Sequence, residues 1–231
     1  MTEFFRFPHT PHLAWLGAGR PRDNKVLAPH EVCELLAGDV VVEEKVDGAN
    51  LGLSVSHDGT LRGQNRGRYL DLEVPQGQWK PLKRWLSTRR HALAEALGQD
   101  LMLFGEWCYA VHSVRYTRLP DWFLAFDVYD LRKAEFWSAN RRTELARSLD
   151  IVTVPERGRG HYDVAGLKAL LGKSQVSDGA AEGLYVRREA NGVLAARAKL
   201  VRAEFAQAIE EHWSKRQLEE NQLAPDAGGL A

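Results

Sequence analysis

Residues 40–50 read VVVEEKVDGAN, and this stretch indicates how the rest of the chain is arranged. Its first part, residues 40–46, is apolar and β-branched, which predicts a buried strand. Asp47-Gly48 is a turn signal, and residues 51–55 then alternate apolar with small or polar side chains, as a second strand does. Lys45 therefore stands at the end of a buried strand, directly before a sharp turn. A lysine in that place is held at a rim instead of extending into solvent.

Further strands are predicted on both sides of helical segments. His57-Asp58-Gly59-Thr60 carries the Asp-Gly hairpin signature, and Asn191-Gly192 is a second strong hairpin signal. The predicted strands after the first two are 61–66, 101–109, 122–129, 151–154, 182–188 and 194–200. Hairpins predominate over regular alternation of strand and helix. The pattern predicts an α+β fold built on antiparallel sheets.

The predicted helices are amphipathic. Residues 81–97 have Pro81 near the first position and Gly98 just past the end, with an apolar stripe opposite a basic face. That basic face either is solvated or meets a phosphate backbone. The other predicted helices are 31–36, 138–149, one from the N-cap Asp163 to Gly172, and 203–218 with Phe205, Ile209 and Trp213 inward.

Composition narrows the class of protein. The chain has 231 residues, 44% of them hydrophobic, and 31 Lys+Arg balance 31 Asp+Glu. These values predict one folded domain over residues 1–220 and exclude a globally basic nucleic-acid coat. Residues 221–231 are predicted to be a flexible tail. No apolar run is long enough to span a membrane, and two cysteines make no disulfide framework, so a reducing, cytoplasmic setting is expected.

Several short motifs place chemical groups at strand ends. Lys45-x-Asp47-Gly48 alone is a weak motif, but Glu106 follows an apolar strand and Phe126-Asp127 ends another. Glu182 begins a further strand. Arg197 and Lys199 lie two residues apart, which aims both at one face of a strand.

In this order the motifs resemble the lysine-adenylating nucleotidyltransferases, which are the ATP-dependent RNA and DNA ligases and the mRNA capping guanylyltransferases. They look most like the RNA ligases of the double-strand-sealing branch. The resemblance covers about residues 40–215. It implies the ligase-type adenylyltransferase fold, with a nucleotide cleft between antiparallel sheets.

The resemblance makes Lys45 the nucleophile that attacks the α-phosphate of ATP and carries AMP. That reaction needs a neutral amine, whereas the ordinary lysine pKa is about 10.4. Arg197 and Lys199 match the family's basic pair, and we expect these cations to lower the pKa of Lys45 and to bind the α-phosphate. The family usually has lysine at both positions, so Arg197 is a departure.

The same resemblance assigns the remaining catalytic and nucleotide-binding residues. Glu106 is expected to bind the ribose hydroxyls and Phe126 to stack on adenine. Glu182 is expected beside Lys45 and the divalent metal, Mg²⁺ or Mn²⁺, since hard cations prefer carboxylate and phosphate oxygens. The other expected nucleotide-binding residues are Arg66 at the AMP phosphate or the 5′-phosphate, Glu44 at the adenine edge, Asp47, and Asn50 at the phosphate and the 3′-terminal nucleotide.

The predicted activity is ATP-dependent joining of a 5′-phosphate to a 3′-hydroxyl of RNA through lysyl-AMP. Three alternatives remain: a minimal DNA ligase, a guanylyltransferase, and a non-catalytic RNA-binding or adenylate-sensing module. The loop 109–116 either contacts RNA or is packed. His9 and His12 are structural or, less plausibly, bind a metal.

Relatives of this class append an OB or helical domain, and too few residues follow 203–218 for an OB barrel. We therefore expect no OB domain here. A bare catalytic domain is expected to seal pre-adenylated or nicked ends better than plain 5′-phosphates, unless a partner protein supplies the missing contacts.

Overall fold

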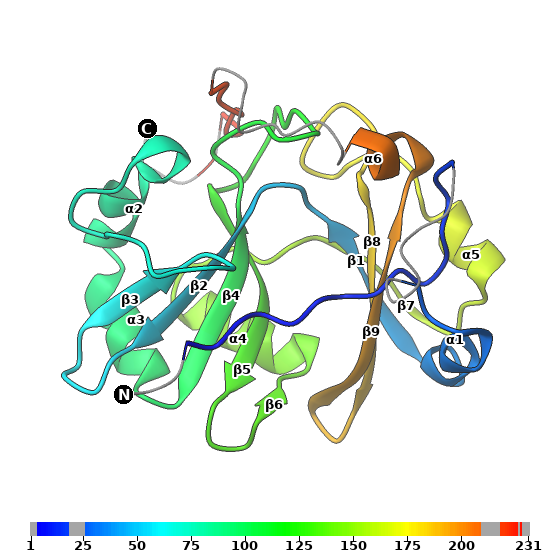
Figure 1. The fold of residues 1–231 in the computed structure, drawn as a ribbon, viewed down its shortest axis with the longest axis horizontal. Helices are drawn as coiled ribbons and strands as arrows, with labels where there is room; N and C mark the ends of the chain where they lie inside the picture. Colours follow the sequence, from blue (N-terminus) through cyan, green and yellow to red (C-terminus); the bar gives the residue numbers. More distant parts are fainter. Residues whose placement is uncertain (1–3, 19–25, 209–217, 226, 228–231) are drawn as a thin grey trace.

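The computed structural model describes residues 4–18, 26–208, 218–225 and 227. Two antiparallel sheets face one another across the centre of the molecule, with helices on their outer sides (Figure 1). The first sheet has the order β7-β1-β8-β9 and the second β3-β2-β4-β5-β6. The predicted α+β class with antiparallel sheets is confirmed.

The first sheet consists of β1 (Val40–Lys45), β7 (Glu156–Gly160), β8 (Gly183–Ala190) and β9 (Val193–Val201). The second consists of β2 (Ala49–Val55), β3 (Leu61–Gln64), β4 (Leu101–Trp107), β5 (Phe123–Asp130) and β6 (Glu135–Phe136). The helices are α1 (Pro29–Leu35), the 3₁₀ turn η2 (Gly77–Trp79), α2 (Leu82–Ser87), α3 (Arg90–Leu97), α4 (Ala139–Ser148), α5 (Val164–Ala169) and α6 (Ala203–Ala208).

The consecutive strands β1 and β2 belong to different sheets, and residues 46–48 connect them. Gly48 makes this crossing possible, because a Cβ there would lie 2.6 Å from the carbonyl oxygen of Trp107. Lys45, the last residue of β1, is therefore held at the boundary between the two sheets.

Each sheet buries its own apolar face. The second sheet packs Leu51, Leu53 and Leu103 against helices α2, α3 and α4. The first packs Val42, Val186 and other residues against α1 and α5. With both outer faces covered by helices, the inner faces are left for polar and aromatic side chains.

Several local predictions are confirmed. Ser138 and Asp163 cap α4 and α5 with their side chains, which accept hydrogen bonds from backbone N–H groups three residues ahead. Asn191 and Gly192 both have positive φ, 53° and 77°, and join β8 to β9 as the hairpin signal predicted.

Other local predictions are wrong. The predicted helix 81–97 is two helices, separated at Thr88 and Arg89, because the Arg89 side chain turns inward over the Trp85 ring and towards Asp121. Residues 151–154 form only an isolated bridge beside β5, and the missed strand β7 begins at Glu156.

The described residues cover only parts of the predicted last helix, 203–218, and of the predicted tail, 221–231. Helix α6 is described as far as Ala208, and Ile209 and Trp213 lie outside the described residues. Residues 218–225, which overlap the predicted flexible tail, run beside the 109–119 loop. Asn221 is buried there and donates to the carbonyl oxygens of Cys108 and Ala110.

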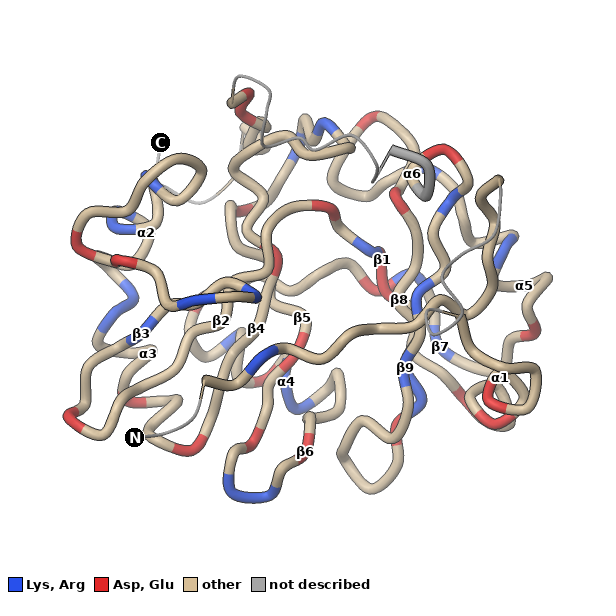
Figure 2. The backbone as a smooth tube through the Cα atoms, in the orientation of Figure 1, with Lys and Arg blue, Asp and Glu red and all other residues tan. Residues whose placement is uncertain are grey.

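Along the described backbone, acidic and basic residues are intermixed over both sheets and their helices (Figure 2). On α2 and α3 the basic side chains of Lys83 and Arg90 both pair with Glu73. Within the described residues, no helix has the length and apolar character needed to cross a membrane.

Candidate active site

The Lys45 ammonium forms a partly buried ion pair with Glu182. Its Nζ lies 2.7 Å from Oε1 and 2.6 Å from Oε2 of the carboxylate. Strand pairing brings the two together, since Lys45 is opposite Gly183 in the β1–β8 register. The Lys45 side chain is 24% exposed and that of Glu182 is 7% exposed. The predicted proximity of these two residues is confirmed.

Two pockets meet at Lys45. The first, named the apolar pocket after its hydrophobic and aromatic wall of Phe7, Val46, Phe126, Val154 and Tyr185, is also lined by the polar residues His9, Thr10, Glu43 and Glu44. The polar pocket is lined mainly by hydrogen-bonding side chains: Asp47, Asn50, Asn65, Gln78, His112 and Ser113. Four residues line both pockets: Lys45, Arg66, Glu106 and Lys199. An apolar cavity joined to a polar one at four charged groups suits a ligand with a flat base at one end and phosphates at the other.

The pKa of Lys45 lies above its ordinary value, contrary to the prediction. Burial lowers it, but the charges of Glu182, Asp47 and Glu106 raise it by more. Without a ligand the amine is therefore a cation. Burial also disfavours the charged form of Glu182 and so raises its pKa, although the charge of Lys45 acts in the opposite direction.

The predicted basic pair is divided between two places. Lys199 lines both pockets and its charge acts on Glu182. Arg197 instead donates to Asp127 at 3.0 Å, and its guanidinium lies 4.7 Å and 4.4 Å from the ring centroids of Phe7 and Phe136. Two residues along a strand span about 6.7 Å, so sharing a face does not bring both cations to one phosphate.

Glu106 lies directly beside the turn that follows Lys45. Its Oε1 accepts the Gly48 N–H at 3.0 Å. Burial raises the pKa of Glu106 to about 7, although the positive charges of Lys45 and Arg66 act in the opposite direction. The carboxyl group therefore titrates near neutral pH while it faces both pockets. Arg66 lies at the tip of a tight turn in which Asn65 Oδ1 accepts two backbone N–H groups.

Phe126 occupies a β-bulge. Phe104 pairs with Asp127 and Gly105 with Ala125, which leaves Phe126 as the extra residue on β5. Its carbonyl oxygen accepts from Arg142 at 2.9 Å and from Arg187 at 3.1 Å. Its ring lines the apolar pocket, as the predicted stacking role requires.

Asn50 is 6% exposed, and neither its amide nitrogen nor its amide oxygen has a hydrogen-bond partner. It lines the polar pocket and pairs with Glu106 across β2 and β4. Because unsatisfied buried polar groups are costly, this amide is suited to hydrogen-bond a ligand.

Two predicted nucleotide-binding residues, Glu44 and Asp47, each line a pocket, but their carboxylates already have partners within the protein. Alternation along β1 turns Glu44 away from the face that carries Lys45, and its carboxylate binds Arg157, Ser174 and the N–H of Gln175. The Asp47 carboxylate accepts the N–H groups of Ser113 and Val114 at 2.6 and 3.1 Å, which fixes the loop 109–116 against the Lys45 turn.

That loop is both packed and part of the site. Val114 and Tyr116 are buried, and the Tyr116 hydroxyl accepts the Asp47 N–H. His112 and Ser113 line the polar pocket, and His112 Nε2 lies 2.9 Å from Gln78 Oε1. Sequence reasoning missed Gln78, since the 3₁₀ turn that carries it has no motif.

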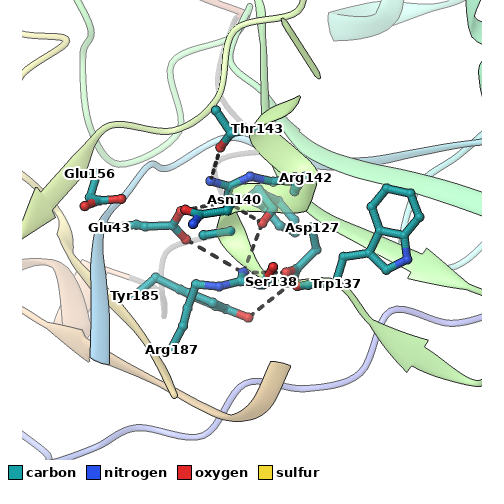
Figure 3. Close-up of polar contacts among 12 residues, drawn as sticks. Glu43, Asp127, Trp137, Ser138, Asn140, Arg142, Thr143, Glu156, Tyr185 and Arg187 are labelled. Carbon is teal, nitrogen blue, oxygen red and sulfur yellow. Dashed lines mark hydrogen bonds and ion pairs between the residues drawn. The ribbon is translucent and has the colours of Figure 1, made fainter. Parts of the chain in front are cut away.

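A buried ionic cluster, drawn in Figure 3, adjoins the apolar pocket through Glu43, which lines that pocket. Arg142 donates to Glu43 at 2.6 Å and Arg187 to Asp127 at 2.5 Å, and all four side chains are at most 3% exposed. Strands β1, β5 and β8 and helix α4 each contribute one residue, so the cluster joins the two sheets. In the sequence, the only indication of this cluster was Glu43, a charged residue within the apolar run of β1.

The described residues contain no group of three or more His, Cys, Asp or Glu side chains suited to hold a metal ion. Mg²⁺ and Mn²⁺ in nucleotide sites commonly use one or two carboxylates together with substrate phosphates. Glu182, which lines the polar pocket and is paired with Lys45, fits that limited role. His9 lines the apolar pocket, while His12 pairs through its backbone with Lys199.

A family model and several solved structures are similar to this chain, and all of them are RNA ligases. Residues 38–201 match the family model described as RNA ligase. Among solved structures, Naegleria gruberi RNA ligase with PPi is 20% identical, covers 80% of this chain and 55% of its own, and has a TM-score of 0.56. A mutant of that ligase with ATP and Mn is 19% identical, with 88% and 63% coverage and a TM-score of 0.58.

Another mutant of the Naegleria enzyme, with AMP and Mn, is 18% identical over 90% of this chain and 64% of that one, with a TM-score of 0.57. The present chain thus spans between about half and two thirds of the length of these structures. No curated protein matches. The fold is that of the ligase-type nucleotidyltransferases. The family match covers most of the sequence, and the chain belongs to the RNA ligase family.

Proposed function

We propose that this protein is an ATP-dependent RNA ligase that joins 5′-phosphate and 3′-hydroxyl ends through an adenylated Lys45. The observation that carries the proposal is the junction of an apolar and a polar pocket at Lys45, Arg66, Glu106 and Lys199. An adenine base fits the first pocket and phosphates the second, with the amine between them. The family match and neighbours solved with ATP, AMP and Mn support this assignment.

Three bond exchanges make up the proposed reaction. First, Lys45 Nζ loses a proton and attacks the α-phosphorus of ATP, and the bond to pyrophosphate breaks. Second, an oxygen of the RNA 5′-phosphate attacks that phosphorus, the P–N bond breaks, and the lysine amine is released. Third, the 3′-hydroxyl loses its proton and attacks the 5′-phosphate, and AMP departs. The protein mainly positions these groups and neutralises charge.

The ion pair with Glu182 decides when the first step starts. While the two are paired, the pKa of Lys45 is raised and its amine is protonated. A ligand that draws the Glu182 carboxylate away removes the strongest charge raising that pKa, whereas the effect of burial remains and lowers it. Nucleotide binding therefore also activates the nucleophile.

The divalent ion is proposed to be held by Glu182 and the phosphates of ATP. It supplies charge neutralisation for the departing pyrophosphate. Lys199, within reach of both pockets, and Arg66 are the cations of this chain that hold the phosphates.

The test is incubation with Mg²⁺ and α-labelled ATP, followed by denaturing electrophoresis. We expect a labelled band at 26.0 kDa that is absent in Lys45→Ala and Lys45→Arg. Lys168→Ala, which removes an exposed lysine of α5, is the matched control and should label normally. Undiminished labelling of Lys45→Ala would refute the assignment of the nucleophile.

A second assay separates RNA ligation from the alternatives. A nicked duplex is offered with either a ribose or a deoxyribose at the 3′-terminal position of the nick. An RNA ligase seals the first faster, because the 2′-hydroxyl is the feature by which proteins distinguish RNA from DNA. Equal sealing of both would favour the minimal DNA ligase. Nucleotide binding without any labelling or sealing would favour the adenylate-sensing module, and labelling by GTP instead of ATP the guanylyltransferase.

A further inference from the structure

The N-terminal arm, residues 4–13, crosses in front of both sheets from β4 and β5 to β9 (Figure 1). Pro8 and Pro11 have a fixed φ and disfavour the helical conformation at the residue before each of them, which favours an extended backbone. The sequence analysis treated this segment mainly as a loop leading into the domain. Its position over the space between the sheets instead places it at the edge of the pockets described above.

The arm is attached to each sheet separately. On the second sheet, Gln64 donates to the Phe5 carbonyl oxygen at 2.7 Å, and the Phe5 ring stacks on Tyr129 with centroids 4.2 Å apart. On the first sheet, the Lys199 N–H donates to Pro11 at 2.9 Å, and the Leu13 N–H donates to Lys199 at 2.7 Å. These contacts hold the arm across the nucleotide cleft at both of its ends.

Between the two attachments the arm forms one wall of the apolar pocket, with Phe7, His9 and Thr10. Phe7 is 5% exposed, and its ring centroid lies 5.4 Å from that of Phe126 at an interplanar angle of 74°. The two rings make a corner. When a flat base stacks on the face of Phe126, its edge meets the Phe7 ring. Edge-to-face contact of this kind is favourable between aromatic rings.

We propose that the N-terminal arm is part of the nucleotide-binding site and that Phe7 is a second aromatic wall that holds the base of ATP in place. The proposal deepens the proposed function, because it depends on the apolar pocket being the ATP site. It assigns a binding role to a residue outside every motif that indicated the family.

Phe5 is the matched control for Phe7. Both lie on the arm, and both pack against Phe104 and Phe136. Phe5, however, does not line the apolar pocket and belongs to a separate one with Met102. Both Phe5→Ala and Phe7→Ala lose aromatic packing on the arm, whereas loss of a nucleotide contact is expected only in Phe7→Ala.

The experiment measures equilibrium binding of an ATP analogue in which a methylene group replaces the oxygen between the α- and β-phosphorus, so that no transfer to lysine occurs. We expect Phe7→Ala to weaken binding at least about fivefold, which is ~1 kcal/mol at 1.4 kcal/mol per factor of ten. Phe5→Ala should stay within about twofold of the unaltered protein. Urea unfolding of both variants gives the fraction that is folded, and Phe7→Leu, which keeps the apolar volume, should fall between the unaltered protein and Phe7→Ala.

Three results would overturn the inference: unchanged affinity of Phe7→Ala, equal losses in the two alanine variants, or no binding of the analogue by the unaltered protein. Its failure can be told from failure of the proposed function. If Lys45 is labelled by ATP but Phe7→Ala binds normally, only the role of the arm is wrong. If the Phe7 effect is present but Lys45 is never labelled, the ligase proposal is wrong and the arm remains part of a nucleotide site.

Discussion

Lys45 is a partly buried cation surrounded by Glu182, Asp47 and Glu106, and in the proposed reaction this environment keeps its amine protonated until ATP binds. The sequence predicted that Lys45, Glu106, Glu182 and Lys199 would lie together, but not that the carboxylates would raise the pKa of Lys45. Motifs record residue types, whereas the pKa depends on which carboxylates face the amine. Arg197, expected to repel that amine, is instead neutralised by Asp127.

Removing the carboxylate of Glu182 should expose the reactivity of Lys45. In Glu182→Gln the strongest charge that raises the pKa is gone, so the amine should acylate faster at about pH 8, as measured by peptide mass spectrometry after a short exposure to an amine-acylating reagent. Glu204→Gln removes an exposed, ion-paired glutamate and is the control. Equal rates in both variants would show that the ion pair does not control the amine.

Glu106 should make nucleotide affinity depend on pH. Its pKa is raised to about 7, so the carboxylate that can accept ribose hydroxyls is formed only as the pH rises through that value. Affinity for the methylene analogue should therefore increase between about pH 6 and pH 8. In Glu106→Gln the corresponding increase should be smaller. The same pH dependence with and without the carboxyl group would contradict this role.

At the scale of elements, Phe126 lies at the bulge in β5 and lines the apolar pocket. An extra residue leaves one carbonyl outside the ladder, and Arg142 and Arg187 satisfy it from α4 and β8. Strand β5 itself was predictable from its apolar run. The bulge was not, because it arises from the register with β4 and from arginines distant in the sequence.

Arg142→Met should be strongly destabilising. It leaves the fully buried carboxylate of Glu43 without its hydrogen-bonding partner, and loss of one partner of a buried pair costs about 3–5 kcal/mol of unfolding free energy. Urea denaturation measures the loss. Arg159→Met breaks a half-exposed pair with Glu156 and should cost about 0–1 kcal/mol. Similar small losses in both variants would mean that the cluster does not hold the sheets together.

The elements that were predicted well are those with strong local signals, such as the capped helix α4 and the hairpin at Asn191-Gly192. Errors occurred where tertiary contacts decide. Helix 81–97 breaks because Arg89 turns towards Asp121, and β7 is polar yet pairs along the edge of β1. Neither contact is visible in a local sequence window.

At the scale of the whole molecule, the proposed ATP site lies between two sheets that have separate cores. A ligand bound there contacts both sheets, through Lys45 from the first and Glu106 from the second. The ionic cluster and the N-terminal arm join the same two sheets. Ligand binding and overall stability are therefore coupled.

That coupling predicts thermal stabilisation by nucleotide. The methylene analogue at about 100 times its dissociation constant should add about 2.7 kcal/mol to the unfolding free energy and raise the melting temperature. Lys45→Ala should retain much of the shift, while Phe126→Ala should lose most of it at the same analogue concentration. A shift of equal size in Phe126→Ala would place the nucleotide outside the apolar pocket.

The central claim is that one amine, that of Lys45, carries the adenylyl group. Its most direct test is peptide mapping by mass spectrometry after incubation of the protein with ATP and Mg²⁺ and removal of free nucleotide. The account predicts an adenylyl adduct on the peptide that contains Lys45, and its loss when RNA with a 5′-phosphate is added. An adduct on another residue, or none on a protein that still seals RNA, would contradict it.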